Sequence, residues 1–222
     1  MTQDTNIEKA VGQVDAVLRG DVRAPHVRAF FHEPTFTASY VVSDDITRRA
    51  AIIDSVWDFD QPSGRTSFES ADEIIAYVQD EELKVDWILE THAHADHLSA
   101  APYLQENLGG KLAIGREIVT VQGVFGKIFN EGTEFVRDGS QFDRLLEDGE
   151  ELTIGEISLI ALHVPGHTPP DIAYVSGDAA FVGDTMFMPD YGSARADFPG
   201  GDPRKLYQSV RRLMRLPDKT RV

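Results

Sequence analysis

Three histidines and an aspartate stand within six residues, in the stretch THAHADH that covers residues 91–97. The apolar segment VDWIL precedes this stretch and predicts a strand. Successive side chains on a strand point to opposite faces, so His92 and His94 share one face that Asp96 and His97 cannot both join. The four side chains converge only on a loop. The chain must therefore fold so that a strand ends here and a polar loop follows it.

The residue types of this loop are those of a metal site. Neutral imidazoles and a carboxylate that meet at a strand end suit zinc or iron in the two-plus state. The alternative is a solvated loop whose histidines bind nothing. Such a cluster is rare in an ordinary composition, so we expect the loop to bind a metal ion.

Length, charge and cysteine content limit the remaining choices. A chain of 222 residues suits one domain, here 1–222, in which 1–28 form an N-terminal helical extension. The net charge of −16 repels phosphate backbones and anionic lipid, so we expect no nucleic-acid and no membrane partner. Because the chain has no cysteine, disulfides, thiolate ligands and a cysteine nucleophile are excluded. The sequence shows neither an apolar run long enough to span a membrane nor a secretory leader, which predicts a cytoplasmic protein. A homodimer is possible.

Hydrophobic periodicity and turn residues predict the elements around this loop. We expect Asp96 to cap a helix that Gly109 ends, and Ser70 with Glu73 has the spacing of a capping box. The polar stretch 130–149 overhangs a site, and 58–70 is a loop. The predicted strands are 35–44, 48–54, 85–91, 111–114, 151–154, 157–164, 172–176 and 179–183; the predicted helices are 6–19, one after Ser70 that carries Ile74, Ile75 and Val78, 97–108, 117–129 and 203–215.

Two later segments add candidate ligands. HVPGHTPPD holds His163 and His167, and FVGDTMF holds Asp184 after an apolar strand. Each signal alone is weak, because a histidine near a Pro-Gly turn is often structural and a Gly-Asp pair often forms a turn.

The order of the three motifs resembles the metallo-β-lactamase superfamily over residues 30–216. This resemblance implies an α+β fold, a four-layer αββα sandwich in which the three loops meet along one edge. It implies roles for the histidine-rich loop, His167 and Asp184, whereas His163 lies on a strand and keeps its structural interpretation.

Within the superfamily the chain is most similar to the persulfide dioxygenases. THAHADH, PGHT, FVGDT and DYGSARADFPGGD, residues 190–202, carry this resemblance. It implies one Fe(II) per chain, with Zn(II) as the alternative, held by His92, His167 and Asp184. Three coordination positions would remain for water, persulfide sulfur and O₂.

The resemblance also implies roles for the residues around the metal. His94, Asp96 and His97 would orient ligands and waters, or hold a second metal ion. Arg195 would bind the substrate, because its planar guanidinium suits carboxylates. An ion pair between Arg195 and Asp197 is an equal alternative.

The chain departs from the superfamily at its end. Members usually supply one more histidine in a strand after the closing helix, but this chain stops at LPDKTRV. The resemblance therefore implies a sandwich without its C-terminal strand and tail. A zinc hydrolase with two metal ions needs that histidine, whereas all three implied iron ligands are present.

Three functions follow from these observations. The first is an iron dioxygenase that converts a glutathione-type persulfide and O₂ to sulfite and thiol. The second is a zinc-dependent hydrolase of a thioester, as in glyoxalase II, or of a lactone. The third is a metal-stabilised binding or structural module without turnover.

Overall fold

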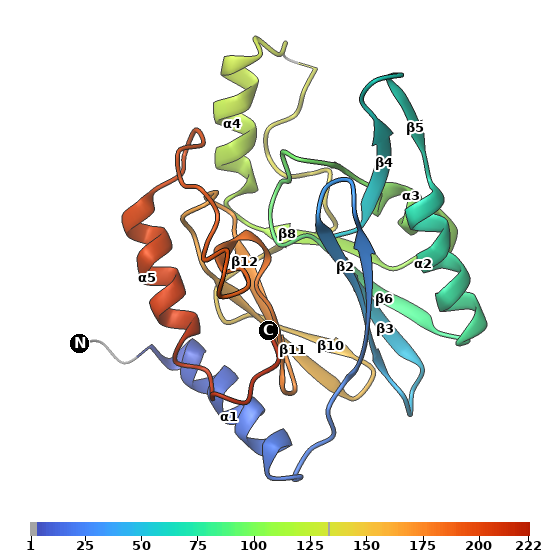
Figure 1. The fold of residues 1–222 in the computed structure, drawn as a ribbon, viewed down its shortest axis with the longest axis vertical. Helices are drawn as coiled ribbons and strands as arrows, with labels where there is room; N and C mark the ends of the chain where they lie inside the picture. Colours follow the sequence, from blue (N-terminus) through green and yellow to red (C-terminus); the bar gives the residue numbers. More distant parts are fainter. Residues whose placement is uncertain (1–3, 133) are drawn as a thin grey trace.

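Two β-sheets pack face to face, with helices on both outer faces (Figure 1). The computed structural model describes residues 4–132 and 134–222. The first sheet has the order β1 (His26–His32), β2 (Thr37–Asp44), β3 (Arg49–Ile53), β6 (Lys84–Leu89), β8 (Lys111–Gly115) and β9 (Arg144–Leu146). The second has the order β10 (Glu151–Ile154), β11 (Ile157–His163), β12 (Ile172–Ser176) and β13 (Ala179–Phe181). A small third sheet joins β5 (Arg65–Ser67), β4 (Val56–Asp60) and β7 (Leu98–Ser99).

Amphipathic helices complete the four layers. The helices are α1 (Thr5–Leu18), α2 (Glu69–Asp80), α3 (Ala101–Leu108), α4 (Ile118–Ile128) and α5 (Pro203–Leu213). α2 and α3 cover the first sheet through buried residues such as Ile74 and Leu104. α1 and α5 cover the second through Ile7, Val14 and Leu213. The predicted αββα sandwich is confirmed.

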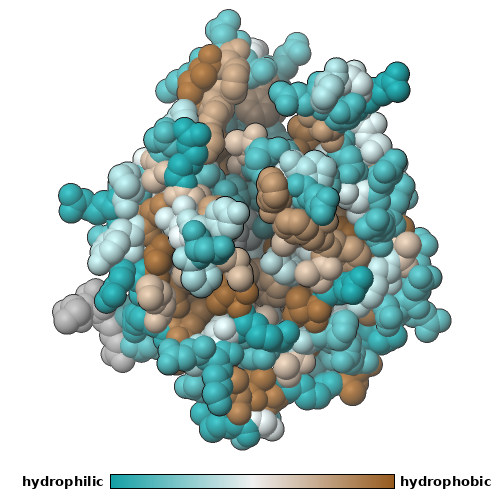
Figure 2. Space-filling view, viewed as in Figure 1, coloured by the Kyte–Doolittle hydropathy of each residue, from teal (hydrophilic) through white to brown (hydrophobic). Residues whose placement is uncertain are grey.

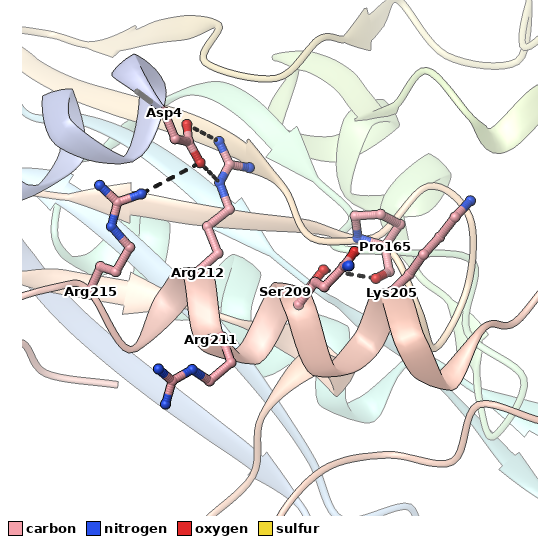
Figure 3. Close-up of a pocket in the computed structure, with 8 residues that line it drawn as sticks. Asp4, Pro165, Lys205, Ser209, Arg211, Arg212 and Arg215 are labelled. Carbon is pink, nitrogen blue, oxygen red and sulfur yellow. Dashed lines mark hydrogen bonds and ion pairs between the residues drawn. The ribbon is translucent and has the colours of Figure 1, made fainter. Parts of the chain in front are cut away.

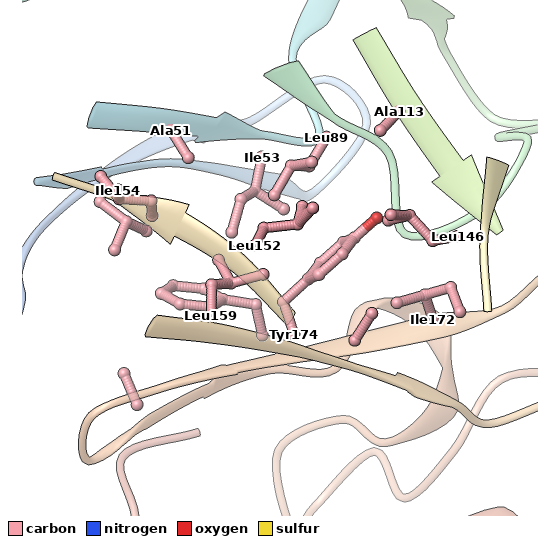
Figure 4. Close-up of a cluster of buried hydrophobic side chains, with 14 residues drawn as sticks. Ala51, Ile53, Leu89, Ala113, Leu146, Leu152, Ile154, Leu159, Ile172 and Tyr174 are labelled. Atoms are coloured by element: carbon pink, nitrogen blue, oxygen red, sulfur yellow. The ribbon is translucent and has the colours of Figure 1, made fainter. Parts of the chain in front are cut away.

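The space between the sheets holds the largest apolar cluster. Tyr174 of β12 is fully buried there, and its ring reaches across the core (Figure 4). Its hydroxyl donates to the carbonyl of Glu90, 2.9 Å away, at the end of β6. This bond ties the second sheet to the end of the strand from which the histidine-rich loop begins.

The predicted start of the helix after the loop is wrong. α3 begins at Ala101, with a proline in its first turn, a position that suits proline because its missing N–H would be unpaired there. Leu98 and Ser99, which precede the helix N-cap Ala100, form β7 and pair with Trp57 and Val56 of β4. The Asp96 side chain therefore caps no helix and is available to the loop.

Other local predictions also need correction. α2 begins at Glu69 without a side-chain cap, because the Ser70 hydroxyl and N–H donate to Asp58 instead. The predicted loop 58–70 contains the β4–β5 hairpin. Strand β1 was not predicted, although it pairs with β2 along its whole length.

The stretch 130–149 contains β9, and two of its side chains, Arg137 and Gln141, contact α4. Arg137 donates to the carbonyls of Gly126 and Glu131, and Gln122 of α4 donates to Gln141. At the far end of the chain, Arg221 forms a single parallel bridge to Ala179 of β13.

The surface is hydrophilic over most of the face in Figure 2, in keeping with the strongly acidic composition. Hydrophobic side chains gather over α4 at the top of this view. None of the helices in the described part of the chain combines the length and apolar character needed to cross a bilayer.

Candidate metal centre

Four imidazole rings form a continuous row at one end of the sandwich. His92, His94 and His97 come from the loop after β6, and His167 from the loop between β11 and β12. The ring centroids lie 5.1 Å apart for His167 and His92, 4.1 Å for His92 and His94, and 4.2 Å for His94 and His97. Loops that are distant in the sequence meet here because the strands before them end at the same edge.

Asp184 joins this row from the short 3-10 turn η1 (Gly183–Thr185) after β13. Its Oδ2 lies 3.4 Å from His167 Nε2 and 3.9 Å from His92 Nε2. One ligand atom from each of these three residues lies within 4.8 Å of the others. The predicted convergence of His92, His167 and Asp184 is confirmed as geometry, and their role as ligands remains a prediction.

Hydrogen bonds set the proton positions on the His92 and His167 rings. The Thr91 hydroxyl donates to Asp54 Oδ2 at 2.8 Å, so its oxygen accepts from His92 Nδ1 at 2.9 Å. His167 Nδ1 donates to the carbonyl of Arg195 at 2.8 Å. Both rings therefore carry hydrogen on Nδ1, which leaves Nε2 as the nitrogen of each ring that would bind a metal ion.

These residues fit a divalent metal ion. His92 Nε2 is buried and has no hydrogen-bond partner among the described residues. Burial holds the pKa of His92 well below its usual value, which keeps the ring neutral. Burial also raises the pKa of Asp184, because it takes the carboxylate out of water. A metal ion would satisfy the lone pair and the negative charge together.

His94 has different surroundings. Its Nε2 donates to Asp54 Oδ1 at 3.2 Å and to Glu90 Oε2 at 3.1 Å. Burial opposes the charged ring, but the Asp54 and Glu90 carboxylates outweigh it and raise the pKa of His94 well above its usual value. Asp54 and Glu90 were not predicted as site residues, although each directly follows a buried strand.

Two further groups could hold a cation. Ligand atoms of His94, Asp96 and His97 lie within 4.8 Å of one another, as do those of Asp54, Glu90 and His94. The hydrogen bond from His97 lowers the pKa of Asp96, so this carboxylate is ionised. The first of these groups is where the sequence predicted either orienting residues or a second metal ion.

Glycines permit the close approach of the site loops. A Cβ on Gly183, whose φ is +49°, would lie 2.5 Å from the Thr91 hydroxyl. A Cβ on Gly166, before His167, would lie 2.3 Å from the backbone of Leu206 in α5. Larger residues at either position would push the ligand-bearing loops apart.

Arg195 lies at the surface in the segment after η1. Its guanidinium donates to both Asp197 carboxylate oxygens, at 2.5 and 2.7 Å, and lies 5.2 Å from the centroid of the Phe198 ring. This is the ion pair named as the alternative, while its substrate role stays a prediction. His163 lies outside the three ligand groups and contacts the carbonyl of Pro169 through Nε2 at 2.8 Å.

A hollow of about 540 Å³ lies away from this centre, along α5 (Figure 3). Lys205, Arg211, Arg212 and Arg215 line it. Arg212 donates to Asp4 at the start of α1, and to Asp148 and the carbonyl of His163. This region joins α1 and α5 to the second sheet and contains none of the candidate ligands.

A family comparison agrees with the geometry. The family model of the metallo-beta-lactamase superfamily matches residues 32–222. The chain belongs to this superfamily. Metallo-beta-lactamase superfamily proteins are generally enzymes, and the three ligand groups lie at the loop edge of the fold.

Several curated superfamily proteins resemble the chain. It is 54% identical over 206 residues to a "Probable metallo-hydrolase" of Burkholderia pseudomallei, covering 88% of this chain and 70% of that protein. It is 45% identical over 188 residues to glyoxylase B2 of Dictyostelium discoideum, covering 84% and 64%. Human mitochondrial persulfide dioxygenase ETHE1 is more distant, at 29% identity over 203 residues, covering 90% and 67%.

This chain spans only part of some relatives. It matches 47% of the length of a beta-lactamase hydrolase-like protein of Agrobacterium fabrum, at 48% identity over 92% of this chain.

Solved structures share the fold. The crystal structure of ETHE1 from Myxococcus xanthus superposes with a TM-score of 0.69 at 28% identity, covering 88% of this chain and 72% of that one. A protein crystallised in a di-iron-bound form superposes with a TM-score of 0.61 at 26% identity, covering 86% and 87%.

Proposed function

We propose that the chain is a mononuclear non-haem iron dioxygenase that oxidises a glutathione-type persulfide to sulfite and thiol. The observation that carries this proposal is the group of His92, His167 and Asp184, in which two imidazoles and one carboxylate bring ligand atoms within 4.8 Å of one another. This is the ligand set of many non-haem iron oxygenases, and it leaves coordination positions open. The similarity to ETHE1 in sequence and in structure supports the same reaction.

The residues of the chain would prepare this chemistry. His92, His167 and Asp184 would hold Fe(II), which when bound supplies positions for the persulfide sulfur and O₂ and moves electrons between them. Thr91 and the carbonyl of Arg195 hold the two imidazoles in the ligating form. The two rings are nearly inaccessible, at 2% and 4% exposure, so bulk water reaches them poorly.

The balance of the reaction places a demand on the site. One persulfide, one O₂ and one water give one thiol, one sulfite and two protons. The site therefore needs a group that accepts protons from bound reactants. In this proposal Arg195 releases Asp197 and binds the carboxylate of the thiol carrier instead. The partners of the chain would be small molecules, and neither nucleic acid nor a membrane.

A zinc-dependent hydrolase of a thioester or lactone is the second candidate. The names of the Burkholderia and Dictyostelium relatives favour it. The group of His94, Asp96 and His97 also favours it, since a second ion there would lie beside the first. A binding module without turnover is the third candidate, and it predicts no activity with any metal.

Metal analysis of protein purified without added metal tests the proposal. We expect one iron per chain and O₂ consumption that depends on glutathione persulfide. Asp184→Ala removes the anionic ligand, so iron content and O₂ consumption should both collapse. Asp96→Asn is the matched control: it should keep most of the iron and slow turnover about 10 to 100-fold.

The hydrolase predicts different results. Two zinc ions per chain, metal loss in both variants and turnover without oxygen would end the dioxygenase proposal.

A further inference from the structure

A file of polar side chains crosses the β1–β2 hairpin and reaches the metal centre. From the centre outward, His97 Nδ1 lies 3.3 Å from Thr37 Oγ1, which lies 2.9 Å from Thr35 Oγ1. Thr35 Oγ1 lies 2.7 Å from His32 Nδ1, and His32 Nε2 lies 3.3 Å from Asp58 Oδ1. The two middle steps are short hydrogen bonds, and the first and last steps are longer contacts of 3.3 Å.

A carboxylate at the inner end sets the direction of this file. Asp96 Oδ2 lies 3.4 Å from His97 Nδ1. The hydrogen bond from His97 lowers the pKa of Asp96, so the carboxylate is ionised and only accepts. His97 Nδ1 must therefore carry the hydrogen, which it directs toward Asp96 and Thr37 Oγ1.

A second carboxylate lies at the outer end. Asp58 accepts from the N–H and hydroxyl of Ser70, and its Oδ1 lies 3.3 Å from His32 Nε2 as an ion-pair contact. With hydrogen on His97 Nδ1, Thr37 can donate to Thr35 and Thr35 can donate to His32 Nδ1.

In the neutral ring this arrangement leaves the lone pair on His97 Nε2. The His97 side chain is 2% exposed, and its Nε2 is buried without a hydrogen-bond partner among the described residues. Its ring packs against His94, the neighbour of His92 in the row. An unpaired acceptor of this kind is costly unless a bound molecule completes it.

The Thr37 hydroxyl is not needed for the hairpin itself. Thr37 opens β2 and pairs with His32 through the backbone, and its side chain is only partly buried. Any residue with a strand conformation could make that pairing. The hydroxyl instead contacts Thr35 Oγ1 and His97 Nδ1.

We propose that Thr37 is a positioning residue that acts with Asp96, and is backed by Thr35 and His32, to hold His97 in the Nδ1–H form, so that its Nε2 accepts a hydrogen bond from the water or persulfide S–H bound at the metal centre. The nature of that donor rests on the proposed function. The proton position on His97 rests on its contacts with Asp96 and with the hairpin.

Nitrogen-15 NMR of the histidine rings tests the proton position in the full-length, metal-free and zinc-loaded chain. We expect His97 to carry hydrogen on Nδ1 in the wild type. Thr37→Val removes the hydroxyl with little change in shape and leaves the half-exposed Asp96, 3.4 Å away, as the remaining acceptor for His97 Nδ1, so part of the population should move to the Nε2–H form. Thr37→Ser should keep the Nδ1–H form. Hydrogen on Nε2 in the wild type, or an unchanged spectrum in Thr37→Val, would overturn the proposal.

Kinetics on the iron-loaded enzyme tests the consequence. Thr37→Val should lower kcat about tenfold or more while KM and iron content stay constant, and Thr37→Ser should recover most of the loss. In a His97→Gln background Thr37→Val should have no further effect, because Thr37 acts through His97. Additive losses in the double variant would show an unrelated structural role and overturn the proposal. If the wild type oxidises no persulfide, the proposed function fails, while the NMR result still decides the proton position.

Discussion

Thr91→Val measures how far metal binding depends on a hydroxyl that does not touch the metal. Thr91 is 2% exposed, and its oxygen stands between Asp54, to which it donates, and His92, from which it accepts. Valine has nearly the same shape, so the substitution removes these two hydrogen bonds and little else. The Thr91 backbone N–H can still donate to Asp54.

The structure supports an estimate of the loss in unfolding free energy and of the loss in metal affinity. The loss of partners for a buried carboxylate oxygen and a buried ring nitrogen should cost the metal-free protein about 1–3 kcal/mol of unfolding free energy. Without its acceptor, His92 no longer has a fixed ring orientation or a fixed proton. Loss of such a supporting contact typically lowers metal affinity about 10 to 100-fold, which corresponds to about 1.4–2.7 kcal/mol.

Two assays separate these effects. Competition with a chelator gives the metal affinity, and urea unfolding of the metal-free chain gives the stability. Thr91→Ser keeps the hydroxyl and is the control, so its metal affinity should stay close to that of the wild type. A metal affinity of Thr91→Val within about twofold of the wild type, or equal losses for the serine and valine variants, would refute the reasoning.

Two further predictions concern stability. Tyr174→Phe leaves the buried carbonyl of Glu90 without its donor, so it should cost about 1–2 kcal/mol and lower the Tm by about 2–8 °C in a thermal scan; an unchanged Tm would contradict this. Burial raises the pKa of Asp171 to about 6 from its usual 3.8, so across this range the folded chain holds a proton that the unfolded chain has released, and stability falls as pH rises. Asp171→Asn removes this loss, so urea unfolding should show its stability rising relative to the wild type by about 2 kcal/mol from pH 4 to 6, and parallel pH profiles would exclude the effect.

The sequence by itself predicted the fold and three segments of the candidate site. Apolar periodicity identified most strands and helices, because burial on one face imposes a repeat that local sequence displays. The order of THAHADH, PGHT and FVGDT resembles the superfamily, and this resemblance implied that His92, His167 and Asp184 meet, as they do in the structure.

Some local signals were overruled by contacts with other elements. Ser70 had the spacing of a cap but bonds Asp58, and Asp96 stood where a helix cap would lie but contacts His97. β7 replaced the predicted start of α3 because β4 lies beside it and pairs with its backbone. A preference of about 1 kcal/mol for a cap yields when tertiary contacts offer other partners.

Only the tertiary structure decided which partners hold the histidines. Asp54 is 37 residues from Thr91 and 40 from His94, and Thr37 is 60 from His97. None of these pairings follows from a local repeat, because hydrogen bonds depend on where strands end in space. The proton positions on the imidazoles, and with them the direction of each lone pair, arise from these long-range contacts.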